Sequence, residues 1–214
     1  MAVNPTIFCR KCGRCKEGNT NGCGILGFKG LSGGGGGFSE RICVDARLCY
    51  ALPEDVDLRL AALVEPLAVG WHAVATAGVS DWEGQSVLVL GGGPVGVATI
   101  LVLRVFGCKT VVVSEPTEVR KEQVKSIADV VLDPVKDDVG EKCRELTGGE
   151  GVDVVFDCAG NQNGFVAGMD ALRFRGTYMN VALWLGSPVS YDSQGIDPPT
   201  LMLCRCRSRS CRSC

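Results

Sequence analysis

The stretch that decides the fold is S-V-L-V-L-G-G-G-P-V-G, which runs from Ser86 to Gly96. It opens with an apolar run, as expected for a strand that is buried on both faces of a parallel sheet. The turn that follows has the spacing G-x-G-x-x-G, ahead of an apolar helix. In a dinucleotide-binding turn such glycines permit the tight bend, the approach of a pyrophosphate to the backbone and the close packing of helix on strand. A plain packing motif without a ligand is the alternative.

An acidic residue stands at the end of the next predicted strand. Glu115 lies 19 residues after Gly96 and can accept hydrogen bonds from the hydroxyls of an adenosine ribose. A carboxylate there repels a 2′-phosphate, so the sequence favours NAD over NADP. Arg120, one turn into the following helix, could instead serve a 2′-phosphate. Its simpler roles are to lie along the adenosine or to pair with Glu115 or Glu118.

Strands and helices alternate from Ser86 onwards, with short connections between them. This pattern is typical of an α/β domain with a doubly wound parallel sheet. The expected strands are 86–90, 110–113, 128–132, 152–156 and 177–183, and the expected helices are 96–106, 117–127, 137–146 and 165–172. Ahead of them we expect strands at 39–44 and 48–52, a helix at 58–64 capped by Asp57, and a helix at 65–78.

The chain changes character after Trp184. No apolar periodicity follows, and residues 203–214 read L-C-R-C-R-S-R-S-C-R-S-C, a basic and cysteine-rich tail of low complexity. A nucleic-acid contact by this tail is the weaker interpretation, because no aromatic residue is interleaved with the arginines. We therefore expect three parts: a first domain at 1–64, a dinucleotide-binding domain at 65–184 and an atypical tail at 185–214.

Four cysteines form a tight array near the start of the chain, with the spacing C-x2-C-x2-C-x7-C. They are Cys9, Cys12, Cys15 and Cys23. Four thiolates satisfy the tetrahedral preference of Zn²⁺ and leave no open position, so the array predicts a structural rather than a catalytic zinc site. An iron–sulfur cluster is the rival, although its motif usually continues x3-C-P. Four unbound, reduced cysteines are the remaining alternative.

The overall composition excludes several classes of protein. The formal net charge is -2, which argues against binding to nucleic acid or to a membrane surface. No apolar run is long enough to span a bilayer, and Met1 does not open a basic segment leading into an apolar one, as a secretory signal would require. We therefore expect a cytoplasmic protein whose 13 cysteines are not joined in a disulfide framework.

Several motifs together resemble one known family. In order, they are the cysteine array, G-G-G-G-G-F-S-E, A-L-V-E-P-L-A-V-G-W-H-A and V-L-V-L-G-G-G-P-V-G. This sequence is similar to the zinc-dependent medium-chain dehydrogenases, and most similar to their 2,3-butanediol dehydrogenase and sorbitol dehydrogenase branch. The pointer to that branch is Glu65, where the classical alcohol dehydrogenases have a cysteine. The resemblance implies a partial, β-rich GroES-like catalytic domain with a zinc lobe, followed by an incomplete Rossmann domain.

The resemblance also implies roles for individual residues. Glu65 would face a catalytic zinc, directly or through water, and that zinc would polarise a substrate hydroxyl. The alternative for Glu65 is a carboxylate that only favours the N-terminus of its helix. The lobe zinc would be held by Cys9, Cys12, Cys15 and Cys23. NAD would be bound by Gly91, Gly93, Pro94, Val95, Gly96, Glu115 and Arg120, and the backbone of Val181, Ala182 and Leu183 would line its nicotinamide.

Two departures from the family pattern stand out. The family places further catalytic-zinc ligands, a cysteine and a Gly-His-Glu segment, ahead of the cysteine lobe, whereas only eight residues precede Cys9. His72, the single histidine, is better explained as an ordinary helix residue than as a substitute ligand. The family also continues through a sixth strand, where this chain has its arginine-rich tail. We therefore expect a chain that is truncated at both ends, with its fifth strand exposed as an edge and a tendency to aggregate.

Two functions follow from these observations. The first is an NAD-dependent, zinc-containing alcohol or polyol dehydrogenase, whose complete form oxidises a small diol or polyol and can form a homo-oligomer. The second is a non-catalytic protein or fragment that binds NAD and zinc without turnover.

Overall fold

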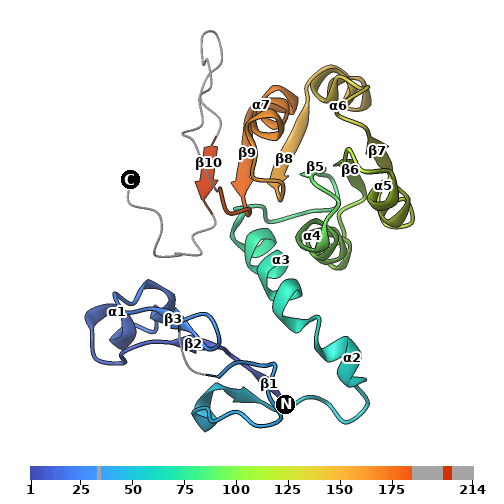
Figure 1. Ribbon diagram of the computed structural model, residues 1–214. Helices are drawn as coiled ribbons and strands as arrows, with labels where there is room; N and C mark the ends of the chain where they lie inside the picture. Colours follow the sequence, from blue (N-terminus) through green and yellow to red (C-terminus); the bar gives the residue numbers. More distant parts are fainter. Residues whose placement is uncertain (33–34, 185–199, 204–214) are drawn as a thin grey trace. The chain divides into compact units, whose positions relative to one another are not determined.

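The computed structural model describes residues 1–32, 35–184 and 200–203, the last four by backbone alone (Figure 1). The described residues form two compact units, and the chain passes from the first to the second between Val64 and Glu65. The first unit is built from short strands and turns, and the second from a parallel sheet with helices. No helix in the described ranges is long and apolar enough to cross a membrane.

The first unit contains two small antiparallel ladders. β1 (Ala2–Val3) pairs with β4 (Cys49–Tyr50), and β2 (Thr6–Ile7) pairs with β3 (Gly27–Phe28). Between β2 and β3 lie one short helix and one 3₁₀ turn, and a second 3₁₀ turn precedes β4: α1 (Gly13–Lys16), η1 (Thr20–Gly22) and η2 (Ala46–Leu48).

The strand expected at 39–44 is not formed. The hydroxyl of Ser39 donates to the carbonyls of Gly36 and Arg41, so this segment is bent by local side-chain bonds. The strand expected at 48–52 is reduced to the two residues of β4.

Two helices lead from the first unit into the second. α2 (Leu58–Ala61) begins after Asp57, whose carboxylate accepts a hydrogen bond from the Arg59 N–H, as the capping prediction requires. α2 ends three residues before the predicted limit. α3 (Val64–Thr76) follows it, with Glu65 in its first turn.

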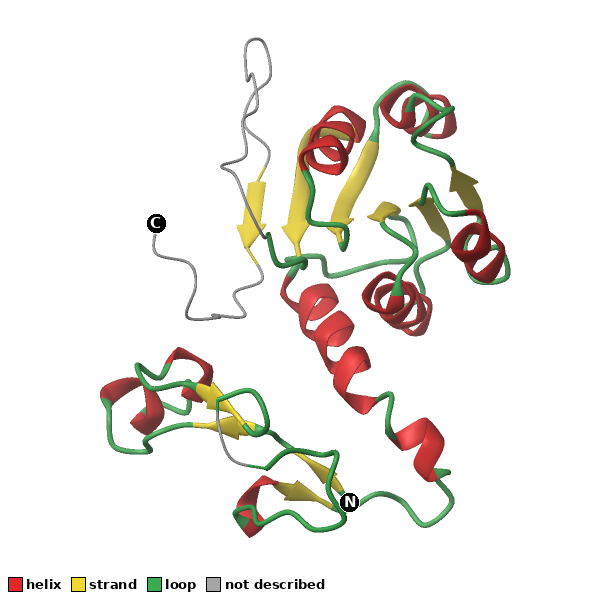
Figure 2. Cartoon of the chain, viewed as in Figure 1, coloured by secondary structure: helices red, strands yellow, loops and turns green. Residues whose placement is uncertain are grey.

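The second unit is a six-stranded parallel sheet with the order β10-β9-β8-β5-β6-β7. Helices lie on both faces of this sheet (Figure 2). The strands are β5 (Ser86–Leu90), β6 (Thr110–Ser114), β7 (Val130–Leu132), β8 (Val152–Asp157), β9 (Leu172–Asn180) and β10 (Thr200–Leu203). The helices are α4 (Pro94–Val105), α5 (Glu118–Val124), α6 (Val139–Leu146) and α7 (Gln162–Ala171). The chain leaves β5 toward β6 and β7, then crosses to β8 on the other side, which confirms the doubly wound fold.

Alternate residues of the strands feed two apolar layers. One layer joins Val87 and Val89 of β5 to α3, α4 and α5. The other joins Leu88 and Leu90 of the same strand to α6 and α7. Because both faces are covered, the central strand needs apolar side chains at successive positions, as its sequence shows.

Two expectations for the end of the sheet are wrong. β9 begins at Leu172, where the predicted helix ended, and stops at Asn180 rather than 183. The tail also contains a strand, because Thr200–Leu203 pairs in parallel with Thr177–Asn180. This strand has only four residues, which is too few to show an alternation of apolar and polar side chains. Its pairing satisfies backbone N–H and C=O groups of β9 that we had expected to be exposed at the edge of the sheet. The other residues after Trp184 for which we expected a tail lie outside the described ranges.

None of the nine cysteines that the structure describes is joined in a disulfide. Cys108 and Cys143 are buried in the second unit, and burial raises the pKa of both thiols. They therefore behave as small apolar side chains.

Candidate functional site

The glycine turn between β5 and α4 has the geometry that its spacing predicts. Gly91 has a φ of 93°, in the left-handed region that favours glycine. At Gly96 a Cβ atom would lie 1.9 Å from the carbonyl oxygen of Gly91, so no side chain fits there. Gly93 caps α4 at its N-terminus, and Pro94 occupies the first turn. The turn thus brings free N–H groups and the positive end of a helix dipole to the edge of the sheet.

Glu115 follows β6 and is 2% exposed. One carboxylate oxygen accepts the N–H of Gly92 at 2.8 Å, and the other accepts the N–H of Thr117 at 2.8 Å. Burial by itself would raise the pKa of Glu115, but these two hydrogen bonds and the nearby Arg120 hold it below its ordinary value. The carboxylate therefore stays charged, and each oxygen keeps a lone pair that could accept from a ribose hydroxyl.

Arg120 lies beside this carboxylate. Its guanidinium is 4.0 Å from Glu115, and a Cβ on Gly93 would lie 3.8 Å from the same nitrogen. The side chain is half exposed, so the ion pair is loose and the guanidinium remains available to a ligand. This arrangement supports the predicted pairing of Arg120 with Glu115.

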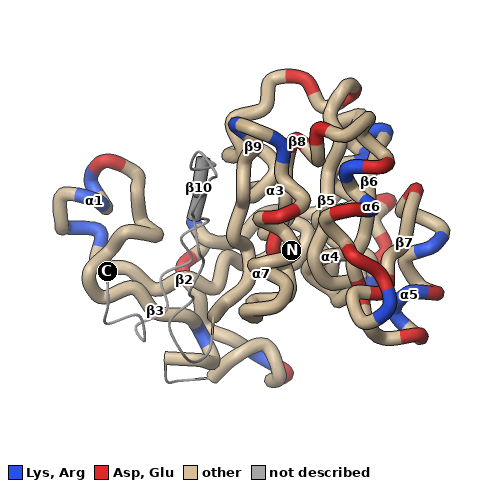
Figure 3. The backbone as a smooth tube through the Cα atoms, turned by 90° about the horizontal axis from the view of Figure 1, so that it is seen from above, with Lys and Arg blue, Asp and Glu red and all other residues tan. Residues whose placement is uncertain are grey.

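A cleft of about 710 Å³ opens at the carboxyl ends of the strands. The predicted residues Gly91, Gly93, Glu115 and Arg120 all line it, whereas Pro94, Val95 and Gly96 do not. Positions of both charges, coloured along the backbone in Figure 3, alternate on α5 and α6. A cleft outside the carboxyl ends, where the strand order reverses, is the usual place for a ligand in such sheets.

Sequence reasoning missed several residues that line this cleft. Cys158 and Ala159 follow β8, and Asn161 caps α7, where its side chain accepts the N–H of Gly164. Their signal was available, since they come directly after a predicted strand of the sheet, at the same edge as the glycine turn.

The segment predicted to face a nicotinamide follows β9. The N–H groups of Val181 and Ala182 both donate to the carbonyl oxygen of Asp157, at 3.0 and 2.8 Å. Leu183 is mostly exposed. These residues do not line the cleft itself, but their hydrogen bonds tie them to the end of β8, the strand whose following residues do.

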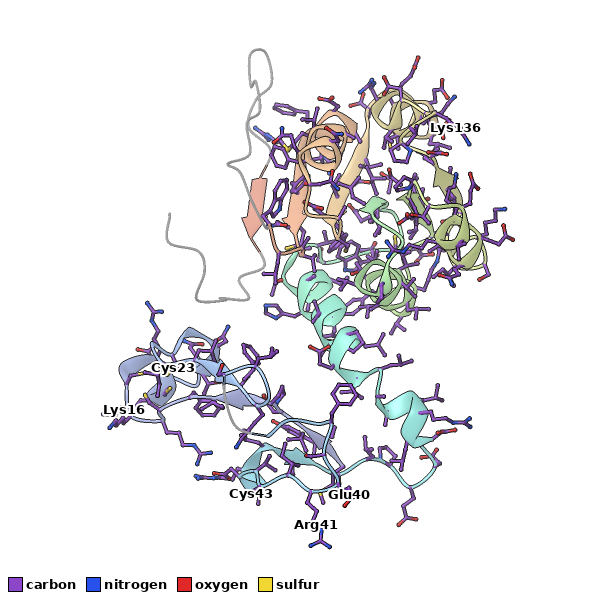
Figure 4. All side chains as sticks on the ribbon, in the orientation of Figure 1. Lys16, Cys23, Glu40, Arg41, Cys43 and Lys136 are labelled. Atoms are coloured by element: carbon purple, nitrogen blue, oxygen red, sulfur yellow. The ribbon has the colours of Figure 1, made fainter. Side chains whose placement is uncertain are left out.

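The four predicted cysteines of the first unit come together. Their sulfur atoms all lie within 4.8 Å of one another, and the Cys9 and Cys15 sulfurs are 4.0 Å apart. Four sulfurs at about 2.3 Å from one Zn²⁺ lie about 3.8 Å apart in a tetrahedron, so the cluster fits the ion. Figure 4 shows the sulfurs gathered beside Cys23, next to α1.

Backbone hydrogen bonds prepare this cluster for a cation. The N–H of Cys12 points at the Cys9 sulfur at 3.3 Å, and the N–H of Cys9 points at the Cys23 sulfur at 3.4 Å. Hydrogen bonds from the backbone of Lys11 and Cys12 lower the pKa of the Cys9 thiol to about 6, whereas desolvation and its fellow thiols raise the pKa of Cys15 to about 12. A bound cation would favour the charged form of Cys15, which burial and its neighbours disfavour.

The remaining predicted ligand stands apart. Glu65 lies exposed in the first turn of α3, and His72 is exposed on the same helix. Within the described residues, the cysteine cluster is the only group of three or more His, Cys, Asp or Glu side chains close enough to share a metal ion. A second, catalytic zinc is thus not supported by the residues around Glu65.

Comparison with known proteins found matches to two protein-family models. Residues 1–54 match the alcohol dehydrogenase GroES-like domain, and residues 94–212 match the zinc-binding dehydrogenase family. The chain belongs to the zinc-dependent alcohol dehydrogenase family. The predicted resemblance is therefore confirmed, and the residues that match the family include those of β10.

Individual relatives point to the same branch. The chain is 40% identical over 192 residues to an (R,R)-butanediol dehydrogenase of Saccharomyces cerevisiae, covering 87% of this chain and 49% of that protein. It is 39% identical over 199 residues to a "Probable diacetyl reductase [(R)-acetoin forming] 2" of the same yeast, covering 91% and 47%. The crystal structure of 2R,3R-butanediol dehydrogenase from Bacillus subtilis matches with a TM-score of 0.82 at 30% identity, covering 94% of this chain and 56% of that one. The chain thus spans about half the length of the curated relatives that it matches.

Proposed function

We propose that this chain binds NAD and a structural zinc ion as part of a dehydrogenase that oxidises a secondary alcohol of a small diol or polyol. The observation that carries the proposal is the cleft at the carboxyl ends of β5, β6 and β8. There a glycine turn, the buried Glu115 and the half-exposed Arg120 meet. The diol or polyol substrate rests on the names of the relatives, which include butanediol dehydrogenases.

The residues present fit NAD in its adenosine half. Glu115 would accept from the adenosine ribose, Gly91 and Gly93 leave the backbone open to the pyrophosphate, and Arg120 would lie over the adenosine. Bound NAD supplies the hydride acceptor of the reaction. The charge of Glu115 disfavours a 2′-phosphate, which supports NAD over NADP.

The residues present also fit the lobe zinc, which would be held by Cys9, Cys12, Cys15 and Cys23. Such an ion cross-links a small unit that lacks a sizeable apolar core. We accordingly propose a catalytic-domain part at 1–64 with this lobe, and the NAD-binding domain at 65–184. Cysteines without disulfides in the described part of the chain support a cytoplasmic location.

A second function is favoured by the exposed Glu65, which has no further metal ligand near it within the described part of the chain. In this alternative the chain binds NAD and zinc but turns over no alcohol. No catalytic step is assigned to Glu65 on this structure.

One set of measurements tests both functions on the full 214-residue chain. Titration calorimetry with NADH and NADPH should show binding of NADH and weaker binding of NADPH, and elemental analysis should find one zinc per chain. Absence of NADH binding would contradict both functions. With binding shown, NADH production from 2,3-butanediol or sorbitol separates the dehydrogenase from the non-catalytic protein.

A further inference from the structure

Two loops at the carboxyl edge of the sheet both donate hydrogen bonds to one buried residue, Asp157. Asp157 ends β8 and is fully buried. One side-chain oxygen accepts the N–H groups of Ala159 and Gly160, both at 2.9 Å. Its main-chain oxygen accepts the N–H groups of Val181 and Ala182. A single residue therefore shapes the loop 158–160 with its side chain and anchors the segment after β9 with its backbone.

The loop 158–160 is packed between two parts of the candidate site. On one side, a Cβ on Gly91 would lie 3.5 Å from the backbone of Cys158 and Ala159. On the other side, Gly160 has a φ of 64°, and a Cβ there would lie 3.0 Å from both the Ala182 Cβ and the Leu183 carbonyl oxygen. The loop thus lies between the glycine turn and the segment 181–183. A methyl group would make ordinary contact on the Gly91 side and would be crowded at Gly160.

We propose that Asp157 is a positioning residue for the nicotinamide half of the cofactor. Its carboxylate holds the loop 158–160 in one shape, and that loop sets where the backbone of 181–183 stands relative to the glycine turn. The inference rests on the proposed binding of NAD and deepens it. A residue fixed in this way controls the ring end of the ligand and leaves the adenosine end, which is held by Glu115 and Arg120, unaffected.

The surroundings of the carboxylate explain which replacement it tolerates. Within the described residues, the second oxygen of Asp157 and the hydroxyl of Tyr178 have no hydrogen-bond partner, and both are buried. Burial first, and then the neighbouring Asp157, raises the pKa of Tyr178, so its hydroxyl stays protonated and neutral. An asparagine would keep the acceptor for Ala159 and Gly160 and could donate its amide to that hydroxyl. An alanine would leave both N–H groups without their acceptor.

The test compares two ligands that differ only in the nicotinamide ring, NADH and ADP-ribose, on the full chain. For Asp157→Ala we expect the dissociation constant of NADH to rise about tenfold, with that of ADP-ribose changed by about twofold or less. Asp157→Asn should restore NADH binding to within about threefold of wild type. The emission of bound NADH, which reports the surroundings of the ring, should shift toward that of free NADH in the alanine variant alone.

Two further variants keep the test decisive. Gly160→Ala disturbs the same loop without touching the buried carboxylate, and it should show the same selective loss of NADH even if Asp157→Ala does not fold. Asp153→Asn alters the other end of β8, where the carboxylate binds Ser86 and Arg173, and it should leave the ratio of the two dissociation constants unchanged.

The outcomes separate this inference from the proposed function. A wild-type chain that binds neither ligand would overturn both. A wild-type chain that binds NADH, with Asp157→Ala and Gly160→Ala binding it equally well, would overturn the positioning role alone. Equal losses of NADH and ADP-ribose in those variants would also overturn it, because they would indicate general damage to the cleft.

Discussion

Single atoms decide the geometry of the glycine turn. Each glycine of G-x-G-x-x-G is needed for a different reason. Gly91 adopts a left-handed φ, Gly93 leaves its backbone open to a ligand, and Gly96 has no space for a side chain. The tight bend at Gly91 and the close packing at Gly96 agree with what the spacing predicted, because both follow from the path of a chain that turns from a strand into a helix. The approach of a pyrophosphate at Gly93 stays a prediction. The sequence could not show that the Glu115 carboxylate also accepts a hydrogen bond from the Gly92 N–H of the turn. That bond depends on how β5 and β6 are placed next to each other.

Gly96→Ala should destabilise the second unit. A methyl group 1.9 Å from a carbonyl oxygen forces the strand and helix apart, and overpacking of this kind costs about 3 kcal/mol. Urea denaturation followed by circular dichroism measures the loss. Gly84→Ala is the matched control, because a Cβ at Gly84 meets nothing within 4 Å. Equal stability of the two variants would contradict the proposed close packing.

Glu115→Gln should narrow the preference for NADH over NADPH. The amide keeps an acceptor for the turn but removes the charge that repels a 2′-phosphate, so the ratio of the two dissociation constants should fall about tenfold, or 1.4 kcal/mol. Titration of both dinucleotides against the variant and the wild-type chain measures the ratio. An unchanged ratio would show that the carboxylate does not face the ribose.

At the level of elements, an ion pair joins α5 to the end of β7. The Lys121 ammonium lies 2.7 Å from the Asp133 carboxylate, and both side chains are 11% exposed. Hydrogen bonds from Lys121 and from the Val135 N–H lower the pKa of Asp133 to about 2. Neither residue belonged to a recognisable motif, because the pairing depends on the register of a helix against a loop.

Stability should depend on the charge of Asp133 in acid. Because its folded pKa is depressed, its contribution is fully present above the ordinary pKa of an aspartate and is lost as the pH falls toward 2. Asp133→Asn should therefore lower the melting temperature at pH 7, and the difference from wild type should shrink toward pH 2. Calorimetry across that range checks it. A difference that persists at pH 2 would assign the effect to hydrogen bonding instead.

The ends of elements proved harder to predict than their existence. Every expected strand from 86 to 156 is present within three residues of its predicted limits, since buried strands carry an unbroken apolar run. The limit between α7 and β9 was misplaced because Leu172 suits either element, and only pairing with Val152 makes it a strand residue. β10 was missed because four residues carry no period.

At the scale of the whole molecule, two units use different means of stabilisation. The second has a continuous core on both faces of its sheet, whereas the first has two-residue ladders and one buried cysteine. The sequence predicted this division through its cysteine array and its apolar strands. It could not predict the ion pair between the Arg10 guanidinium and the Asp45 carboxylate, which are 2.6 Å apart. This pair links the segment that carries the four cysteines to η2.

Removal of zinc should therefore unfold the first unit only. Cys23→Ser is expected to lose the bound zinc and the hydrogen-exchange protection of residues 6–28, because a structural zinc site supplies folding free energy directly. Protection of β5, β6 and β8 should remain. The control is Cys43→Ser, since Cys43 is exposed and outside the cluster. Loss of protection in both units would show that they fold as one.

The strand order has a consequence for how the protein is made. β5 is synthesised first and lies at the centre, β6 and β7 extend the sheet outward on one side, and β8, β9 and β10 then extend it on the other. Each strand that leaves the ribosome after β5 therefore pairs with a strand that has already been synthesised. No strand has to insert between two strands that formed before it. The sheet can therefore assemble in step with translation, at the pace of about 5–20 residues per second at which the chain emerges.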